Sequence, residues 1–228
     1  MAAVVIRGVN VRLGGRAIFT GVDLNVGPGE AVAVEGTSGA GKSTLLHVVA
    51  GLIRPESGSV EIGGERIDRL SDRRRSAVRL RLVGSVFQFG ELLPEFNVIE
   101  NVELPLRLLG WRREPAHERA LACLREVGIE ELAKRSLAQV SGGQMQRAAI
   151  ARAVAHDPRV ILADEPTGSL HPEAAEHVMQ LLTRTSRRHD AGLIVVTHDR
   201  AVSAQCDRTL RLSGGLLQAD GARNAAST

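Results

Sequence analysis

A glycine-rich stretch near the N-terminus combines the residue types that bind a phosphate group. It reads Gly36-Thr37-Ser38-Gly39-Ala40-Gly41-Lys42-Ser43-Thr44 and fits the pattern G-x-x-x-x-G-K-[ST] at every fixed position. Glycines let the backbone curl so that several N–H groups converge on one phosphate. Lys42 would place a charge on the β- and γ-phosphates, and the Ser43 hydroxyl would ligate Mg²⁺. We expect a nucleoside triphosphate here; the alternative is a glycine-rich turn that binds nothing.

The residues around this loop predict the elements that must position it. The apolar run Ala31-Val32-Ala33-Val34 precedes the loop and predicts a buried strand. Leu45-Leu46-His47-Val48-Val49 follows and predicts the first turns of a helix that starts near Lys42. The positive N-terminal end of such a helix favours an anion at the loop.

A second apolar run ends in two carboxylates, Val160-Ile161-Leu162-Ala163-Asp164-Glu165. In phosphate-loop NTPases such a strand lies beside the loop, and its aspartate belongs to the Mg²⁺ shell. Glu165 would then lie nearer the γ-phosphate and could orient or deprotonate the attacking water. Two exposed acids at a strand end are the alternative, which the upstream phosphate loop disfavours.

With these motifs in place, the chain resembles the ABC-type ATPases. Val140-Ser141-Gly142-Gly143-Gln144 is similar to the signature sequence of that family. Gln88 resembles its Q-loop glutamine, and His198, after Val195-Val196-Thr197, resembles its switch histidine. The order and spacing of the motifs match along essentially the whole chain.

The resemblance implies roles for individual residues. ATP and Mg²⁺ would bind at Gly36–Thr44 and Asp164, with Ser43, Gln88 and Asp164 near the metal and Glu165, His198 and Gln88 catalytic. The family also holds ATP between two copies, so Ser141, Gly142, Gly143 and Gln144 of a second copy would bind ATP in trans, with Ser141 and Gly143 contacting the γ-phosphate. The chain departs from the family at His171, where Asp is usual, and at Val11-Arg12-Leu13, where an aromatic residue usually stacks on adenine. Arg12 could stack there instead.

Further segments resemble one group of ABC ATPases. The stretch from Gln88 to Leu106 and the sequence Ala163-Asp164-Glu165-Pro166-Thr167-Gly168 are typical of the lipoprotein-releasing and macrolide-exporter (MacB-type) group. That resemblance implies an integral membrane permease with an FtsX-like domain, a peripheral position on the cytoplasmic face of the membrane, and a lipoprotein, peptide or drug as cargo. The alternatives are a soluble ABC ATPase acting on the ribosome or DNA, and a weakly hydrolysing nucleotide-dependent regulator.

The pattern of elements predicts one α/β domain over residues 1–218, a phosphate-loop NTPase core with a mostly parallel sheet. The core would comprise about 1–89 and 157–218, with an N-terminal antiparallel β-subdomain and an inserted α-helical subdomain at about 90–156. Gly8 and Gly14-Gly15 should separate antiparallel strands, and Pro105 should kink or break a helix. Residues 219–228 are predicted to be a disordered tail.

Composition narrows the classes of partner. The net charge is only +3, and the arginines between Arg66 and Arg81 have no aromatic residues among them, so no nucleic acid is expected. That arginine cluster predicts a solvated helix face or one near lipid phosphates. The chain has no run of the ~20 apolar residues that a membrane helix needs. Cys123 and Cys206 should be reduced and buried. Three phenylalanines around Gln88 predict either a groove for a helix of a membrane subunit or internal packing; these are Phe87, Phe89 and Phe96.

Overall fold

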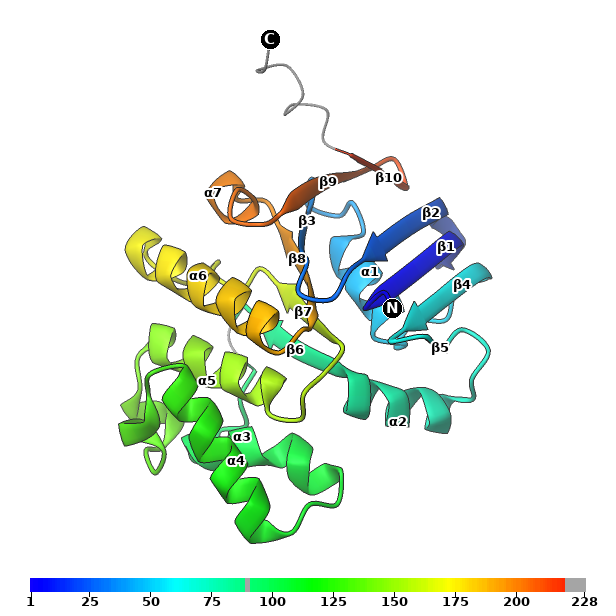
Figure 1. The fold of residues 1–228 in the computed structure, drawn as a ribbon. Helices are drawn as coiled ribbons and strands as arrows, with labels where there is room; N and C mark the ends of the chain where they lie inside the picture. Colours follow the sequence, from blue (N-terminus) through cyan, green and yellow to red (C-terminus); the bar gives the residue numbers. More distant parts are fainter. Residues whose placement is uncertain (89–90, 220–228) are drawn as a thin grey trace.

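The computed structural model describes residues 1–88 and 91–219, which are organised around a six-stranded sheet (Figure 1). The strand order is β10(Leu216–Ala219), β9(Arg208–Ser213), β3(Ala31–Glu35), β8(Gly192–Thr197), β7(Val160–Asp164) and β6(Val83–Phe87). Neighbouring strands run parallel, except that β10 pairs antiparallel with β9. Parallel strands need long crossovers, which the helices supply. The predicted α/β fold with a mostly parallel sheet is confirmed.

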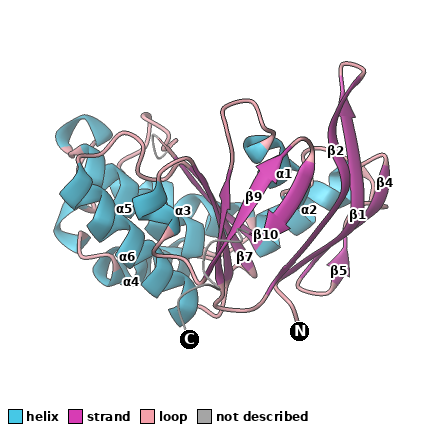
Figure 2. Cartoon of the chain, turned by 90° about the horizontal axis from the view of Figure 1, so that it is seen from above, coloured by secondary structure: helices cyan, strands magenta, loops and turns pink. Residues whose placement is uncertain are grey.

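Alternate residues of β3 face two different hydrophobic cores. Val32 and Val34 pack toward α1(Lys42–Val49) and the N-terminal sheet, whereas Ala31 and Ala33 pack on the side of α5(Gly142–Val154) and α6(Pro172–Arg188). In Figure 2, α1 lies between the two sheets, and α5 and α6 lie beyond the six-stranded one. A strand buried on both faces is apolar at successive positions, which explains the run that precedes the phosphate loop.

The N-terminal sheet is antiparallel, in the order β2(Arg16–Val26), β1(Val4–Leu13), β4(Ser57–Ile62), β5(Glu65–Arg66). The turn predicted at Gly14-Gly15 joins β1 to β2, as expected. The break predicted at Gly8 is wrong, because β1 continues through it. Gly8 has a φ of 55° and lies where the pairing with β2 shifts register. Such a β-bulge accommodates the glycine without ending the strand.

Between β6 and β7 the described chain is helical. It contains α3(Val98–Leu108), α4(Arg113–Glu126), two short 3₁₀ turns, η1(Glu130–Leu132) and η2(Leu137–Gln139), and α5. Asn97 caps α3 through two reciprocal hydrogen bonds. The Asn97 side chain accepts from the backbone N–H of Glu100, and the Glu100 carboxylate accepts from the backbone N–H of Asn97. Pro105 lies inside α3 and does not end it. Fully buried Val102 and Leu106 hold the helix on both sides of the proline.

One predicted boundary needs correction. Ala219, expected in the tail, belongs to β10, while α2(Asp72–Leu82) leads directly into β6. Residues 220–228 lie outside the described part, so their predicted disorder is not tested. The short helix α7(Arg200–Ser203) follows β8. Within residues 1–88 and 91–219, every helix is too short or too polar to span a bilayer.

Candidate active site

The phosphate loop leaves the carboxyl end of β3 and passes directly into α1. Gly41, the residue before the helix, has a φ of 100°, and a Cβ there would lie 2.9 Å from Cγ2 of Ile18 and 3.0 Å from Cε1 of Phe19. A Cβ on Gly36 would lie 2.7 Å from the carbonyl oxygen of Leu212. Glycine is therefore required at both ends of the loop. Gly41 is required by its backbone conformation and by the lack of space for a side chain, and Gly36 by the lack of space alone.

Lys42 closes the loop from inside. Its Nζ donates to the carbonyl oxygen of Gly36 at 2.8 Å and to that of Thr37 at 3.4 Å. These bonds hold the ammonium group over the loop, beside the N-terminus of α1. A cation and a helix N-terminus at one place are an arrangement that favours an anion.

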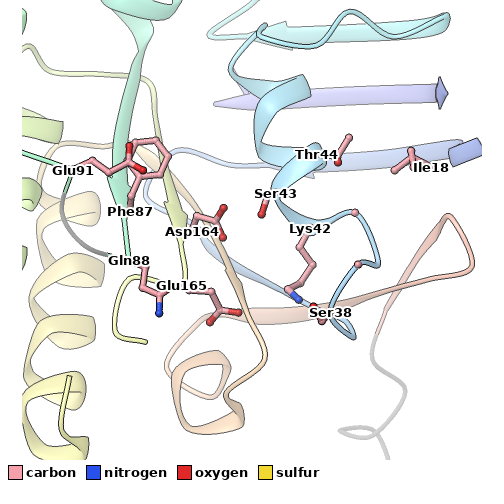
Figure 3. Close-up of a pocket in the computed structure, with 12 residues that line it drawn as sticks. Ile18, Ser38, Lys42, Ser43, Thr44, Phe87, Gln88, Glu91, Asp164 and Glu165 are labelled. Carbon is pink, nitrogen blue, oxygen red and sulfur yellow. The ribbon is translucent and has the colours of Figure 1, made fainter. Parts of the chain in front are cut away.

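The register of the sheet brings the remaining candidates to the same edge. Asp164 pairs with Phe87 of β6 on one side and with Val196 of β8 on the other, and all three lie near the carboxyl ends of their strands. The result is a cavity of about 580 Å³ beside the loop (Figure 3). Its lining residues are Ile18, Ser38, Gly39, Gly41, Lys42, Ser43, Thr44, Phe87, Gln88, Glu91, Asp164 and Glu165. In Figure 3 the Ser43 hydroxyl and the Asp164 carboxylate face each other across it.

Glu165 is held in a defined orientation at the mouth of this cavity. Its Oε2 accepts a hydrogen bond from Oγ1 of Thr197 at 3.1 Å, and its Oε1 lies 2.7 Å from Nδ1 of His198. The backbone at Glu165 has a φ of 45°, an unusual value for a residue with a side chain. Strained backbone of this kind persists where the surroundings over-determine it and clusters at functional sites. His198 joins the site through Glu165, and its side chain is 74% exposed.

Gln88 reaches the same cavity from the end of β6. Its carbonyl oxygen accepts from Oγ of Ser169 at 3.0 Å, and its side chain lies against Gly168, where a Cβ would be 2.8 Å from Nε2. The loop after Glu165 is therefore packed directly on the glutamine. Of the predicted phenylalanine cluster, Phe87 lines the cavity, Phe96 is partly exposed, and Phe89 lies outside the described residues.

Sequence reasoning missed a buried amide that connects this region to α5. Nε2 of Gln146 donates to the carbonyl oxygens of Phe87 at 2.7 Å and Pro166 at 2.5 Å, and the side chain is fully enclosed. A polar residue on a helix ordinarily indicates a solvent-facing position, so no local signal identifies it. Ile18 was also missed, because its place beside the loop depends on how β2 packs.

The signature residues form a second helix N-terminus, separate from the cavity. Ser141 caps α5. Its Oγ accepts from the backbone N–H of Gln144 at 3.3 Å, and the Gln144 side chain accepts from the backbone N–H of Ser141 at 2.8 Å. The described residues that line the cavity do not include Ser141, Gly142, Gly143 or Gln144. One copy of the chain thus presents two separate anion-binding geometries.

Comparison with known proteins decides the family. A family model described as ABC transporter matches residues 19–168, a span that contains the phosphate loop, the signature and the Asp164-Glu165 pair. The chain belongs to the ABC transporter family. It is an ABC-type ATPase, and the resemblance drawn from its motifs is confirmed.

Relatives with an assigned name match over nearly the full length. The lipoprotein-releasing system ATP-binding protein LolD of Hyphomonas neptunium is 45% identical over 204 residues, covering 90% of each chain. The protein of the same name from Geobacter metallireducens is 43% identical over 203 residues, covering 89% of this chain and 90% of its own. The lipoprotein-releasing group named from the sequence is therefore the group that these relatives represent.

Solved structures agree with the fold. The dimeric ATP-binding cassette MJ0796, in a post-hydrolysis state bound to ADP and Pi, has a TM-score of 0.81 and 37% identity, covering 94% of this chain and 96% of its own. The cassette cbiO1 from Clostridium perfringens, part of the transporter complex cbiONQ, has a TM-score of 0.86 and 27% identity, covering 95% and 86%. The roles assigned to single residues remain predictions.

Proposed function

We propose that this chain binds ATP in the cavity beside Gly36–Thr44 and hydrolyses it to drive a membrane permease. The convergence of Lys42, Ser43, Asp164 and Glu165 on that cavity is the observation that carries the proposal. Its volume, about 580 Å³, suits a nucleotide, since ligand pockets commonly span ~300–1,000 Å³.

Glu165 is the group placed to activate water. The water oxygen forms a bond to the γ-phosphorus while the bond from that phosphorus to the bridging oxygen of ADP breaks, and the Glu165 carboxylate accepts the proton. Thr197 keeps the carboxylate aimed at the cavity through its hydrogen bond. Lys42 binds the β- and γ-phosphates, which carry the developing negative charge.

The oxygen donors in the cavity fit a magnesium ion. The Ser43 hydroxyl and the Asp164 carboxylate face each other, and Gln88 adds an amide oxygen from the neighbouring strand. Hard cations prefer oxygen ligands of these kinds. When bound, such an ion neutralises phosphate charge. Ser43, Gln88 and Asp164 would hold it.

A second copy would complete the site. Ser141, Gly142, Gly143 and Gln144 lie outside the cavity of their own chain, and the N–H groups at the start of α5 can bind a phosphate. In a head-to-tail homodimer each signature faces the phosphate loop of the partner, so ATP closes two sites at once. The dimeric state of MJ0796 supports this arrangement.

A groove on the chain supports a permease partner. It has a volume of about 430 Å³ and lies between α2, β6, α3 and α5, with Leu80, Leu104, Pro105 and Leu108 among its lining residues. An amphipathic helix can lay its apolar face into such a groove. The LolD relatives are ATP-binding proteins of a lipoprotein-releasing system, which supports lipoproteins as the cargo. The partner would then be the FtsX-like permease that the sequence motifs imply, with this chain at the cytoplasmic face of the membrane.

Glu165→Gln tests the ATPase proposal. We expect ATP hydrolysis to fall by ~100-fold or more, with ATP binding and ATP-dependent dimerisation retained. Glu118→Gln, an exposed change on α4, is the matched control. Normal steady-state hydrolysis in the Glu165 variant would exclude the proposed role. Co-purification from cells with ribosomes or DNA, and not with an integral membrane protein, would favour the soluble alternative.

A further inference from the structure

Positive charge is concentrated on two segments that flank the apolar groove. Residues 66–82 contain seven arginines and two aspartates, and residues 107–113 contain three arginines and no acidic residue. The whole chain carries only +3, so the rest of the sequence is net negative. Both α2 and α3 line the groove: Ser76, Arg79 and Leu80 come from α2, and Leu104, Pro105 and Leu108 come from α3. In Figure 1 both helices lie in the lower part of the molecule.

Four of these arginines are exposed and have neither an ionic nor a hydrogen-bond partner for their side chains within residues 1–88 and 91–219: Arg73, Arg74, Arg112 and Arg113. Arg107 is also exposed and forms no ion pair in that range, but its guanidinium donates to the carbonyl oxygen of Trp111. Other members of the cluster are paired: Arg66 with Asp68, Arg75 with Asp72, and Arg81 with Glu65. Arg73 precedes Ser76 by three positions on α2, so it projects from the same side of the helix as the groove wall.

Two large apolar side chains lie beside the unpaired arginines. Leu108, at the end of α3, is 63% exposed, and Trp111, in the turn before α4, is 40% exposed. Tryptophan combines an apolar ring with a polar N–H and is favoured at the boundary between lipid and water. Exposed tryptophan and leucine among unpaired arginines are the combination found in interfacial membrane-binding surfaces.

We propose that this surface binds the headgroups of anionic phospholipids. The arginine face comprises Arg73, Arg74, Leu108, Trp111, Arg112 and Arg113. Its guanidinium groups bind phosphate oxygens in pairs, while Leu108 and Trp111 enter the headgroup layer. The net negative remainder of the chain is repelled by the same lipid surface, so the protein binds with the groove toward the bilayer. The interaction needs neither nucleotide nor permease.

Sedimentation with vesicles tests the proposal. The full chain, without nucleotide, is mixed with vesicles of phosphatidylglycerol and phosphatidylcholine, or of phosphatidylcholine alone, at low and high salt. We expect binding to the anionic vesicles only, weakened by salt because the attraction is screened. Each arginine near an anionic surface favours binding roughly fivefold, so the double variant Arg73→Gln/Arg74→Gln should bind ~10-fold less well or worse. Arg112→Gln/Arg113→Gln should behave alike.

The matched control is Lys134→Gln/Arg135→Gln, which removes two exposed charges after η1, away from the groove. It should bind like the unaltered chain.

Trp111→Ser should weaken vesicle binding without changing the salt dependence of that binding. Equal losses in the control and the arginine-face variants would reduce the effect to net charge and overturn the proposal. So would absence of binding to anionic vesicles. ATP hydrolysis in each variant, measured without lipid, is a separate readout, so the proposed ATPase function can stand or fall independently.

Discussion

Nδ1 of His198 lies 2.7 Å from Oε1 of Glu165, so the exposed imidazole and the proposed base share a hydrogen bond. A neutral imidazole that donates through Nδ1 has only an acceptor at Nε2. It therefore cannot also donate to a phosphate oxygen unless it is protonated or releases Glu165. In the proposed mechanism ATP binding should change this pair, and His198 would connect the γ-phosphate to Glu165, the proposed base.

We expect His198→Ala to lower kcat by ~100-fold, with a much smaller change in ATP affinity, because the contact matters most as charge develops on the phosphate. Steady-state hydrolysis and nucleotide titration measure the two effects separately. His117→Ala is the control, since His117 also pairs with a glutamate, Glu103, but outside the cavity. An unchanged kcat in the His198 variant would remove it from the mechanism.

Gln146→Leu should both destabilise the protein and slow hydrolysis. The change leaves the carbonyl oxygens of Phe87 and Pro166 without their buried donor, at a cost of about 1–3 kcal/mol for each unpaired group. Urea unfolding measures the loss. Gln146→Glu should be worse, because it turns a carboxylate toward the same oxygens. Gln180→Leu on α6, where the glutamine is exposed, should change stability by less than about 0.5 kcal/mol. Equal effects at the two positions would contradict this assignment.

Gly41→Ala should abolish tight nucleotide binding while the protein still folds. The new methyl group meets Ile18 and Phe19, and the left-handed backbone adds strain of about 1–3 kcal/mol. Nucleotide titration and thermal unfolding measure the two losses. Gly14→Ala separates the contributions, because Gly14 also has a positive φ, but a Cβ added there would have no other atom within 4 Å. If Gly41→Ala bound ATP normally, the loop geometry would not control the site.

Mixing two inactive variants tests the shared site. Lys42→Ala damages the phosphate loop, and Ser141→Arg blocks the signature, so each homodimer should be inactive. In a head-to-tail heterodimer one of the two sites combines an intact loop with an intact signature. An equal mixture should therefore regain up to about a quarter of the original hydrolysis if subunits exchange freely and sites act independently. No recovery, despite demonstrated exchange, would mean that the signature does not act in trans.

The two thiols predict a pH dependence of stability. Burial raises the pKa of Cys123 from 9.0 to about 11 and that of Cys206 to about 12. As the pH rises, the thiols of the unfolded chain therefore lose their protons first. The free energy of unfolding keeps its full value below about pH 9 and falls as the pH rises toward the pKa values of the thiols in the folded chain. Urea unfolding between neutral and alkaline pH should show a decline that is shallower in Cys123→Ala/Cys206→Ala. An identical decline would assign it to other groups.

The parts of the candidate site that depend on local geometry could be predicted from the sequence. The phosphate loop and the Asp164-Glu165 pair follow buried apolar strands, and the carboxyl ends of parallel strands meet at one edge of a sheet, so their convergence could be expected. Gln146 could not be found this way, because its burial depends on two loops distant in the sequence. The break at Gly8 was predicted wrongly for a related reason: the glycine weakens an isolated strand, but pairing with β2 keeps β1 continuous. Of the two outcomes predicted for Pro105, a break does not occur, because buried Val102 and Leu106 hold α3 on both sides of the proline.

The separation of the signature from the cavity has a kinetic consequence. If each catalytic centre is assembled from two molecules, turnover per subunit is not a fixed property of the chain. In dilute solution, below the dissociation constant of the dimer, the hydrolysis rate would rise with the square of the protein concentration. Confinement to a surface, or attachment in pairs to one permease, would raise the local concentration and switch the enzyme on without any change in ATP supply.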